Sequence, residues 1–269
     1  MIAGLFSFNI KHKNQAMISD PTKRFSDRVD NYVKYRPGYP HEVLTHLKDV
    51  CNLPKGAVIA DIGAGTGIFT RLLLDEGYVV KSIEPNQPML AAAKLMLGGY
   101  ENFIPIDGIA EATTLEENSV DCIVCAQAFH WFNNGHTRVE FERILKPGGK
   151  AALIWNNRSV HGDDFLKAYD ALLKSNSVDY NKVNHQNVND IDFKAFFKEG
   201  GYQLKKFPNE QVFDEEGLIG RAFSSSYVPP ENSEEGKKFL ELLKDVFDEY
   251  NTDGKVVFRY DTEVYTGEV

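Results

Sequence analysis

Cysteine is scarce in this sequence, which has three cysteines among its 269 residues. Three thiols cannot build a closed disulfide framework, so we expect a reducing compartment and a cytoplasmic protein. Cys122 and Cys125 have the C-x-x-C spacing of some zinc and redox sites, but they lie in an apolar run that is typical of a buried strand. Residues three positions apart on a strand point to opposite faces of the sheet. We therefore expect two core thiols there, and no metal site.

Long apolar runs and a surplus of basic residues are also missing. No stretch approaches the roughly 20 apolar residues that span a membrane, and the first residues, MIAGLFSFNIKHK, lack the pattern of a signal peptide. The chain has 39 acidic and 30 basic residues, which gives a net charge of −9. Proteins that bind nucleic acids through phosphates usually have the opposite balance. We therefore expect neither a membrane nor a nucleic acid as partner, and the oligomeric state stays open.

Short β-branched runs alternate with longer helical segments from about residue 44 onward. Gly77 suits the end of one predicted helix, and Asn86 suits the start of the next. Strands that alternate with helices of this length indicate an α/β fold with a parallel sheet covered on both faces. The predicted strands are 58–60, 78–83, 103–106, 122–125 and 151–155, and the predicted helices are 68–76, 89–97 and 137–145.

The two ends of the chain differ from this alternating region. Residues 1–24 are mostly polar and irregular, so we predict an N-terminal extension there. The last third shows strand patterns at 202–207 and 256–264, with an amphipathic helix at 235–250 between them. We predict that these strands extend the same sheet and do not form a second domain.

A glycine-rich turn, ADIGAGTG over residues 60–67, follows the first predicted strand. Glycines there let the backbone turn sharply and let a ligand lie against it. The spacing is G-x-G-x-G, whereas dinucleotide-binding turns have G-x-G-x-x-G. Asp61 precedes the first glycine, where a carboxylate would repel a pyrophosphate and attract an ammonium group. Glu84 ends the next strand, where an acid can accept hydrogen bonds from both ribose hydroxyls.

These features together indicate a nucleoside ligand that has a cationic part and no phosphate, which describes S-adenosylmethionine. They argue against an oxidoreductase that uses a nicotinamide dinucleotide. The alternative interpretation takes Asp61 as a solvated turn residue and Glu84 as an ordinary surface acid.

Five segments occur in an order that resembles a known family: ADIGAGTGIFT, IEPNQPML, CAQAFHWF, LKPGG and IWNNR. They resemble the class I S-adenosylmethionine-dependent methyltransferases of the type 11 family. FSDRVDNYVKYRPGYP and SSSYVPP resemble the branch that includes trans-aconitate methyltransferase-like proteins. The resemblance implies a Rossmann-like, seven-stranded, mostly parallel sheet with helices on both faces and an antiparallel C-terminal edge strand. It also implies a methyltransferase domain over residues 25–269, with residues 25–45 as a lid segment.

The resemblance assigns cofactor contacts to the residues that match the family motifs. Ile109 stands where the family often has an acid near the adenine amine, so the backbone of Ile109 and Ala110 is expected to serve there, with Asp107 as an alternative. Met89 would lie near the adenine or be an ordinary core residue. The expected cofactor-binding residues are Asp61, Gly63 and Gly65 for the methionine part, Glu84 for the ribose, Met89, Ile109 and Ala110 for the adenine, and Ala126 and Gln127 beside the sulfonium.

Three residues are candidates for a role in catalysis. His130 could act as a general base, line the pocket or be purely structural. Tyr35 and Arg36 belong to the lid segment: the tyrosine could bond the cofactor's carboxylate or cross the methyl path, and the arginine could pair with a carboxylate. Both could instead be surface residues of a loop. Arg158, Arg221 and residues 224–227 are further candidates for substrate contacts.

The resemblance implies methyl transfer from S-adenosylmethionine to a small-molecule acceptor, with an organic acid carboxylate as one option. A carboxylate is ionised near neutral pH and needs no general base, whereas a hydroxyl or carbon nucleophile usually needs one. Two other functions stay open: an S-adenosylmethionine-binding protein without catalysis, and a methyltransferase that acts on RNA or protein.

Overall fold

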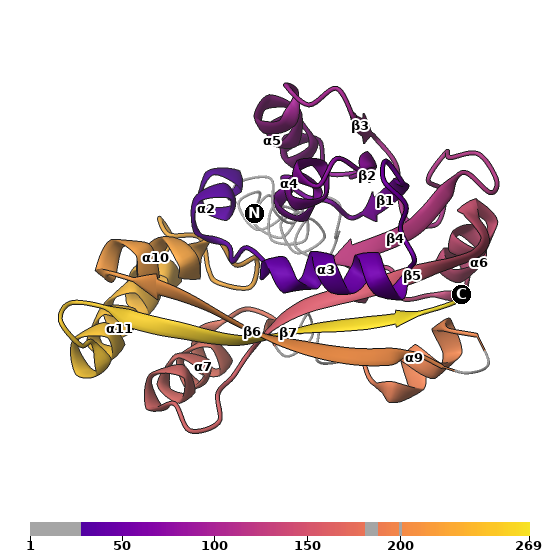
Figure 1. Cartoon of the computed structure of the whole chain (residues 1–269). Helices are drawn as coiled ribbons and strands as arrows, with labels where there is room; N and C mark the ends of the chain where they lie inside the picture. Colours follow the sequence, from indigo (N-terminus) through magenta and orange to yellow (C-terminus); the bar gives the residue numbers. More distant parts are fainter. Residues whose placement is uncertain (1–27, 181–187, 199–200) are drawn as a thin grey trace, which may run out of the picture.

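A computed structural model of the chain describes residues 28–180, 188–198 and 201–269. The predicted N-terminal extension and residues 25–27 of the predicted lid lie outside these ranges. The described residues form one seven-stranded sheet in the order β3-β2-β1-β4-β5-β7-β6 (Figure 1). Among them, no helix is both long enough and apolar enough to span a bilayer.

The sheet is parallel on one side and antiparallel at the other edge. β1 (Val58–Ile62), β2 (Val79–Ile83), β3 (Phe103–Ile106), β4 (Val120–Ala126) and β5 (Leu145–Arg158) run parallel. β7 (Val256–Gly267) lies antiparallel to β5 and to the edge strand β6 (Gln203–Phe213). The predicted Rossmann-like sheet with its antiparallel C-terminal edge is confirmed, as is the prediction that the last third extends the same sheet.

Four predicted helices are present, namely α4 (Ile68–Asp75), α5 (Gln87–Leu97), α6 (Gly135–Ile144) and α11 (Glu234–Tyr250). The side chain of Asn86 accepts a hydrogen bond from the Met89 N–H at 3.1 Å, which caps α5 as predicted. The structure adds helices that the patterns above did not define: α2 (Val29–Tyr35), α3 (His41–Val50), η1 (Phe129–Trp131), α7 (Asp164–Asn176), α9 (Asp190–Phe196) and α10 (Glu215–Phe223).

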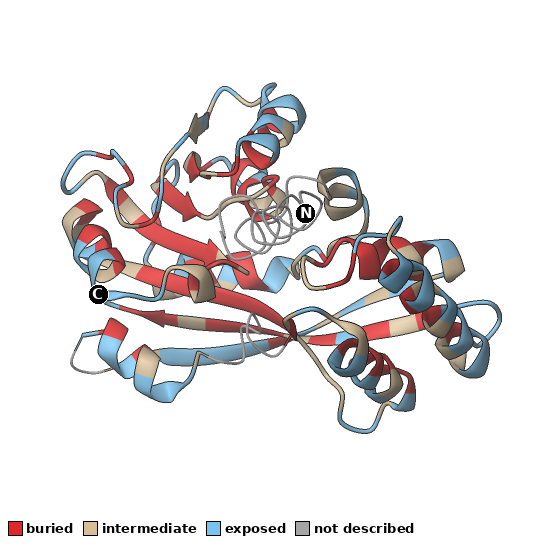
Figure 2. Ribbon diagram, turned by 180° about the vertical axis from the view of Figure 1, so that it is seen from behind, coloured by how far each residue is buried: buried red, intermediate tan, exposed pale blue. Residues whose placement is uncertain are grey.

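The central strands are buried on both faces, as Figure 2 shows. Cys122 belongs to the core under α3, α4 and α5, whereas Cys125 belongs to the opposite core under α6 and α9. Both cysteines are fully buried free thiols, and the Cys122 Sγ lies 3.6 Å from the Cys51 Sγ of the first core. Within the described residues, no group of His, Cys, Asp and Glu could hold a metal ion. The prediction of core thiols on opposite faces is confirmed.

A third core joins α7, α10 and α11 to one end of the long strand β7. These helices gather beside the half of the sheet that lies away from β3 (Figure 1). Helix α2 packs against α10, where Lys34 forms an ion pair with Glu216 at 3.2 Å. This packing brings α2 and α10 to the carboxyl ends of β1, β4 and β5, where open α/β sheets bind their ligands.

Candidate functional site

The glycine-rich turn between β1 and α4 is fixed to the neighbouring strand. The N–H groups of Gly63 and Ala64 donate hydrogen bonds to the Ile83 carbonyl at 2.9 and 3.1 Å. Gly63 has a φ of +71°, and a Cβ at this position would lie 2.6 Å from the Ala128 Cβ. Any side chain here would force Ala128 or the turn to move, so the close packing of the turn against η1 requires glycine.

Asp61 lies at the carboxyl end of β1 with its side chain fully buried. Its Oδ2 accepts a hydrogen bond from the Thr70 hydroxyl at 2.6 Å, whereas its Oδ1 has no hydrogen-bond partner among the described residues. Burial raises the pKa of Asp61 to about 7; the Thr70 bond opposes this shift and the negative charge of Glu84 adds to it. A cation that reached Oδ1 would offset the free-energy cost of burying the carboxylate and would satisfy its unmet hydrogen bond.

Glu84 is 7% exposed and lies directly after β2. Its Oε2 accepts a hydrogen bond from the Gly65 N–H, and its Oε1 accepts one from the Asn86 N–H, both at 2.8 Å. Burial raises its pKa, and the two backbone bonds oppose the shift. Each carboxylate oxygen can accept a second hydrogen bond, so the group is oriented to receive two neighbouring hydroxyls.

Two cavities meet at the carboxyl ends of the parallel strands. The Glu84 cavity, of about 340 Å³, is bordered by the turn, the start of α5 and the segment after β3. The arginine cavity, of about 210 Å³, runs from Asp61 to α7 and α10 and is lined by Arg36, Arg158 and Arg221. The residues that line both cavities are Tyr32, Gly63, Ala126, Gln127 and Trp131.

The predicted adenine contacts gather in the Glu84 cavity. Met89, Ile109 and Ala110 all line it, Ile109 being 44% exposed, while Met89 and Ala110 are buried. Asp107 is exposed and is not among the residues that line this cavity, so it does not replace the missing acid. Glu111 does line the cavity, and its Oε1 accepts a hydrogen bond from the Asn134 side chain at 2.8 Å.

Gln127 follows β4 in a backbone conformation that is rare outside glycine. Its φ is +60°, and its N–H donates to the Ile154 carbonyl at 2.8 Å. A non-glycine residue in the left-handed region stores backbone strain, which is common at functional sites. The strained residue and its neighbour Ala126 line both cavities, at the place where the sequence predicts contacts with the sulfonium.

The arginine cavity has a surplus of positive charge. The acids that line it are Asp61 and Asp170, and Asp170 already forms ion pairs with Arg158 at 3.6 Å and Lys174 at 2.6 Å. The cavity therefore receives four cationic side chains but only one carboxylate apart from Asp61. Surplus buried cations are costly, so this wall favours an anionic ligand.

The arginines of this wall are held in place by neighbouring polar groups. Arg221 is 4% exposed and donates to the Ser225 hydroxyl at 3.2 Å, while its Nε has no hydrogen-bond partner in the described part of the chain. Arg36 donates to the Ser224 carbonyl at 2.9 Å, and burial together with the charge of Arg221 lowers its pKa. Arg158 donates to the Tyr180 hydroxyl.

Tyr32 lies between the acidic and the basic ends of the site. Burial raises its pKa, Arg36 and Arg221 lower it, and Glu84 and Asp61 raise it, so charges from both ends reach its ring. The Arg36 guanidinium stacks over the same ring, 4.8 Å from its centre. Tyr32 therefore marks the junction where a ligand in one cavity would meet a ligand in the other.

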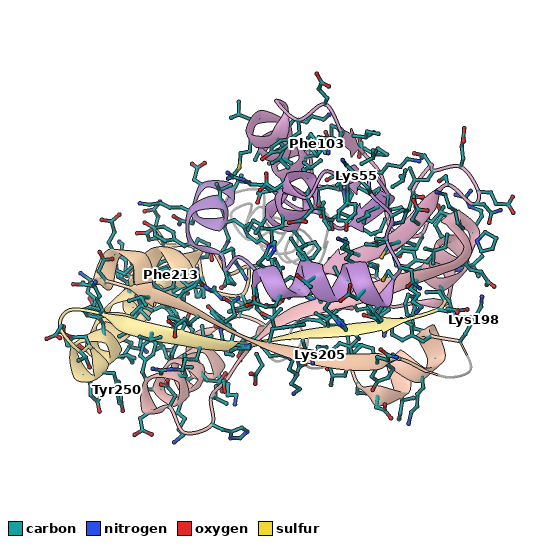
Figure 3. All side chains as sticks on the ribbon, viewed as in Figure 1. Lys55, Phe103, Lys198, Lys205, Phe213 and Tyr250 are labelled. Carbon is teal, nitrogen blue, oxygen red and sulfur yellow. The ribbon has the colours of Figure 1, made fainter. Side chains whose placement is uncertain are left out.

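Tyr35, which the sequence predicts to be catalytic, lies outside both cavities. Its hydroxyl donates to Glu216 at 3.2 Å, and its ring packs edge-on against Phe213, 6.4 Å between centres. Figure 3 shows Phe213 beside α10, away from Lys205 in the other half of β6. Tyr32 and Arg36 both line the arginine cavity, whereas Tyr35 packs against Phe213 and against Gly220 of α10. The four-residue spacing of Tyr32 and Arg36 within a helix is the signal in the sequence that points to Tyr32.

His130 lies in η1 and lines the arginine cavity. Its Nδ1 accepts a hydrogen bond from the Trp155 indole N–H at 3.4 Å. In the neutral imidazole the proton then lies on Nε2, which makes this nitrogen a donor. The contact favours His130 as a hydrogen-bond donor in the pocket wall over a general base.

Comparisons with known proteins agree with the geometry. A family model described as a methyltransferase domain matches residues 60–153. The chain is similar to an uncharacterized methyltransferase of Mycobacterium tuberculosis, with 36% identity over 52% of this chain and 54% of the relative. It is also similar to an uncharacterized methyltransferase of Bacillus thuringiensis, with 30% identity over 62% of this chain and 76% of the relative. The chain spans about half the length of the first of these two relatives.

Solved structures share the fold at low sequence identity. A proposed type II methyltransferase from Anaeromyxobacter dehalogenans superposes with a TM-score of 0.66 and 19% identity, over 87% of this chain and 98% of that chain. The YcgJ protein of Bacillus subtilis superposes with a TM-score of 0.54 and 18% identity, over 86% of this chain and 100% of that chain.

Proposed function

Because the chain belongs to the class I S-adenosylmethionine-dependent methyltransferases, we propose that it methylates a small-molecule acceptor through a carboxylate of that acceptor. The observation that carries the proposal is the separation of charge along the site. Asp61 and Glu84 provide an acidic end, and Arg36, Arg158 and Arg221 provide a basic end. A cationic cofactor and an anionic acceptor would each meet the opposite charge, with Tyr32 between them.

The residues at the acidic end suit S-adenosylmethionine. The Oδ1 of Asp61, which has no hydrogen-bond partner among the described residues, would accept from the ammonium group of the cofactor, and the backbone of Gly63, which lines both cavities, would border its methionine part. Glu84 would accept from the two ribose hydroxyls, and the Glu84 cavity would hold the adenine against Met89 and Ile109. Ala126 and Gln127 would then lie beside the sulfonium.

The cofactor brings an activated methyl group, so the protein must chiefly bind and align the acceptor. Correct alignment of two reactants can supply about 7–11 kcal/mol of the barrier. Guanidinium groups suit this task because they can hold a carboxylate through two parallel hydrogen bonds. A carboxylate is already ionised near neutral pH, which agrees with a donor role for His130 in place of a general base.

We propose that α2 belongs to a lid over this site, within a methyltransferase domain that spans residues 25–269. Tyr32 from α2 lines both cavities, and Arg36 directly after it donates to the Ser224 carbonyl beyond α10. The lid would exclude water from the junction, which strengthens the electrostatic contacts there.

The test is methyl transfer from labelled cofactor to a panel of small carboxylic acids, phenols and amines. We expect methyl esters from acids, and di- or tricarboxylates as the best acceptors, since within the described residues neither Arg36 nor Arg221 pairs with a carboxylate. Methylation of phenols or amines in preference to acids would overturn the carboxylate assignment. Cofactor binding without transfer to any acceptor or macromolecule would favour a non-catalytic binding protein.

A further inference from the structure

Tyr227 occupies the arginine cavity without a role in the function described above. Its carbonyl accepts a hydrogen bond from the Val178 N–H at 3.0 Å, which fixes the backbone. Its ring stands edge-on to Tyr180 with 4.9 Å between the ring centres. These contacts hold the phenol in one place on the cavity wall.

The titratable and polar side chains around Tyr227 come from several of the elements that form the cavity wall, and most of these side chains are cationic or neutral. Arg158 from β5, Ser225 from the loop after α10, and the charges of Arg221 and Arg36 all act on the ionisation of its phenol. The other titratable groups of this wall or its surroundings are Tyr169, Asp170 and Lys174 from α7, Tyr180 after α7, and Tyr260 from β7.

The phenol thus lines one cavity together with three guanidinium groups, and Asp170, one of the two acids of that cavity, is shared between Arg158 and Lys174. Among the described residues, Arg36 and Arg221 form no ion pair with a carboxylate, so a counter-charge for them is missing when no ligand is bound. Burial would raise the pKa of Tyr227, but Arg158, Arg221 and Arg36 outweigh burial and lower it to about 8. The pKa is raised in nine other tyrosines, whereas in Tyr227 it is lowered.

We propose that Tyr227 is a positioning residue: at alkaline pH its phenolate balances the arginines in the empty site, and the acceptor carboxylate replaces it in this role. The inference rests on the proposed function. On acceptor binding, the phenolate oxygen takes one proton from solvent, and no other bond forms or breaks. The neutral phenol then donates a hydrogen bond to one carboxylate oxygen, which leaves the other oxygen to face the methyl group.

The first test follows the ionisation of tyrosine by ultraviolet difference absorbance in the full-length protein. We expect wild type to show one tyrosine that ionises near pH 8, and Tyr227→Phe to lack it. Tyr100→Phe, which removes a tyrosine far from the cavities, keeps this component. Saturating succinate, used as a probe dicarboxylate, moves the midpoint of wild type upward by about one pH unit or more.

Either of two results overturns the proposal: no tyrosine that ionises near pH 8 in wild type, or an ionisation that succinate leaves unchanged. The measurement needs no methyl transfer, so its outcome is separate from that of the acceptor panel. If acids are methylated and the absorbance signal is absent, the proposed function stands and the role of Tyr227 falls.

The second test is the pH dependence of the acceptor KM, measured with the acid that the panel identifies. The phenolate competes with the acceptor carboxylate, so the wild-type KM should rise about tenfold for each pH unit above 8. Tyr227→Phe should give a KM that is nearly flat over the same range, with unchanged cofactor affinity and thermal midpoint. A purely structural role would lower stability and leave the pH dependence of KM as it is in wild type, and that result would exclude the exchange.

Discussion

The acidic and basic ends of the site are built in different ways. The cofactor end comes from one continuous stretch of the chain, which runs from the end of β1 through α4 and β2 to the start of α5. This stretch contains Asp61, Gly63, Glu84 and Met89. Arg36, Arg158 and Arg221, by contrast, come from α2's end, the end of β5 and α10. The cofactor end is therefore specified locally, whereas the acceptor end exists only once distant segments have packed together.

Asp61→Asn should have the largest effect, because it removes the charge at the cofactor end. The amide keeps a polar atom for the Thr70 hydroxyl but no longer attracts an ammonium group. Hydrogen bonds to charged groups are worth about 1.5–3 kcal/mol, so cofactor affinity should fall roughly tenfold to 150-fold. Calorimetric titration with S-adenosylmethionine measures this. Unchanged affinity would show that the cofactor does not use this carboxylate.

Arg221→Gln should act on the acceptor end alone. Loss of one charged partner should cost about 2 kcal/mol, or roughly a thirtyfold drop in kcat/KM for the acceptor, with cofactor affinity unchanged. Arg221→Lys keeps the charge but not the paired hydrogen bonds, so its kcat/KM for the acceptor should lie between those of wild type and Arg221→Gln. Arg259→Gln is the matched control, because Arg259 forms a partly exposed ion pair with Asp163 at 2.6 Å, away from both cavities. Equal losses in both variants would point to a general electrostatic effect.

The pH dependence of cofactor binding sharpens the contrast between the two ends. The ammonium group needs Asp61 in its charged form, and the pKa of Asp61 is raised from 3.8 to about 7. Affinity should therefore weaken about tenfold for each pH unit below 7 and level off above it. The same raised pKa stabilises the free protein fully below pH 3.8, and this contribution is lost as the pH rises to 7. Binding in Asp61→Asn should be independent of pH, and a pH-dependent variant would assign the effect to another group.

Tyr35→Phe should have the smallest effect. It removes an exposed contact with Glu216, which is worth about 0–1 kcal/mol of stability, and should leave turnover as in wild type. Tyr32→Phe, on the same helix, should lower turnover because its phenol lies at the junction of the cavities. Turnover at several pH values and thermal midpoints for both variants test this. If Tyr35→Phe lost more turnover than Tyr32→Phe, Tyr35 would have to be counted among the residues of the site.

The cofactor end could be predicted from the sequence because its signals are short-range. The glycine spacing, the acid before it and the acid after the next strand follow from strand-turn-helix geometry. The cavity-lining face of α2 does not follow from a loop interpretation of the segment around Tyr35, whereas a helical period there pairs Tyr32 with Arg36. Asp170 and Tyr180 carry no local signal at all: they reach Arg158 only because α7 packs against α11 and β7.

The fastening of α2 to the C-terminal part of the chain has a consequence for the order of events during turnover. Arg28 donates to the Ser225 carbonyl, Arg36 to the Ser224 carbonyl, and the Gln211 side chain to the Tyr35 carbonyl. An outward swing of α2 that releases spent cofactor must break contacts beside the methylated product as well. We expect departure of the two products to be sequential and linked, which product-inhibition kinetics would reveal as a compulsory order.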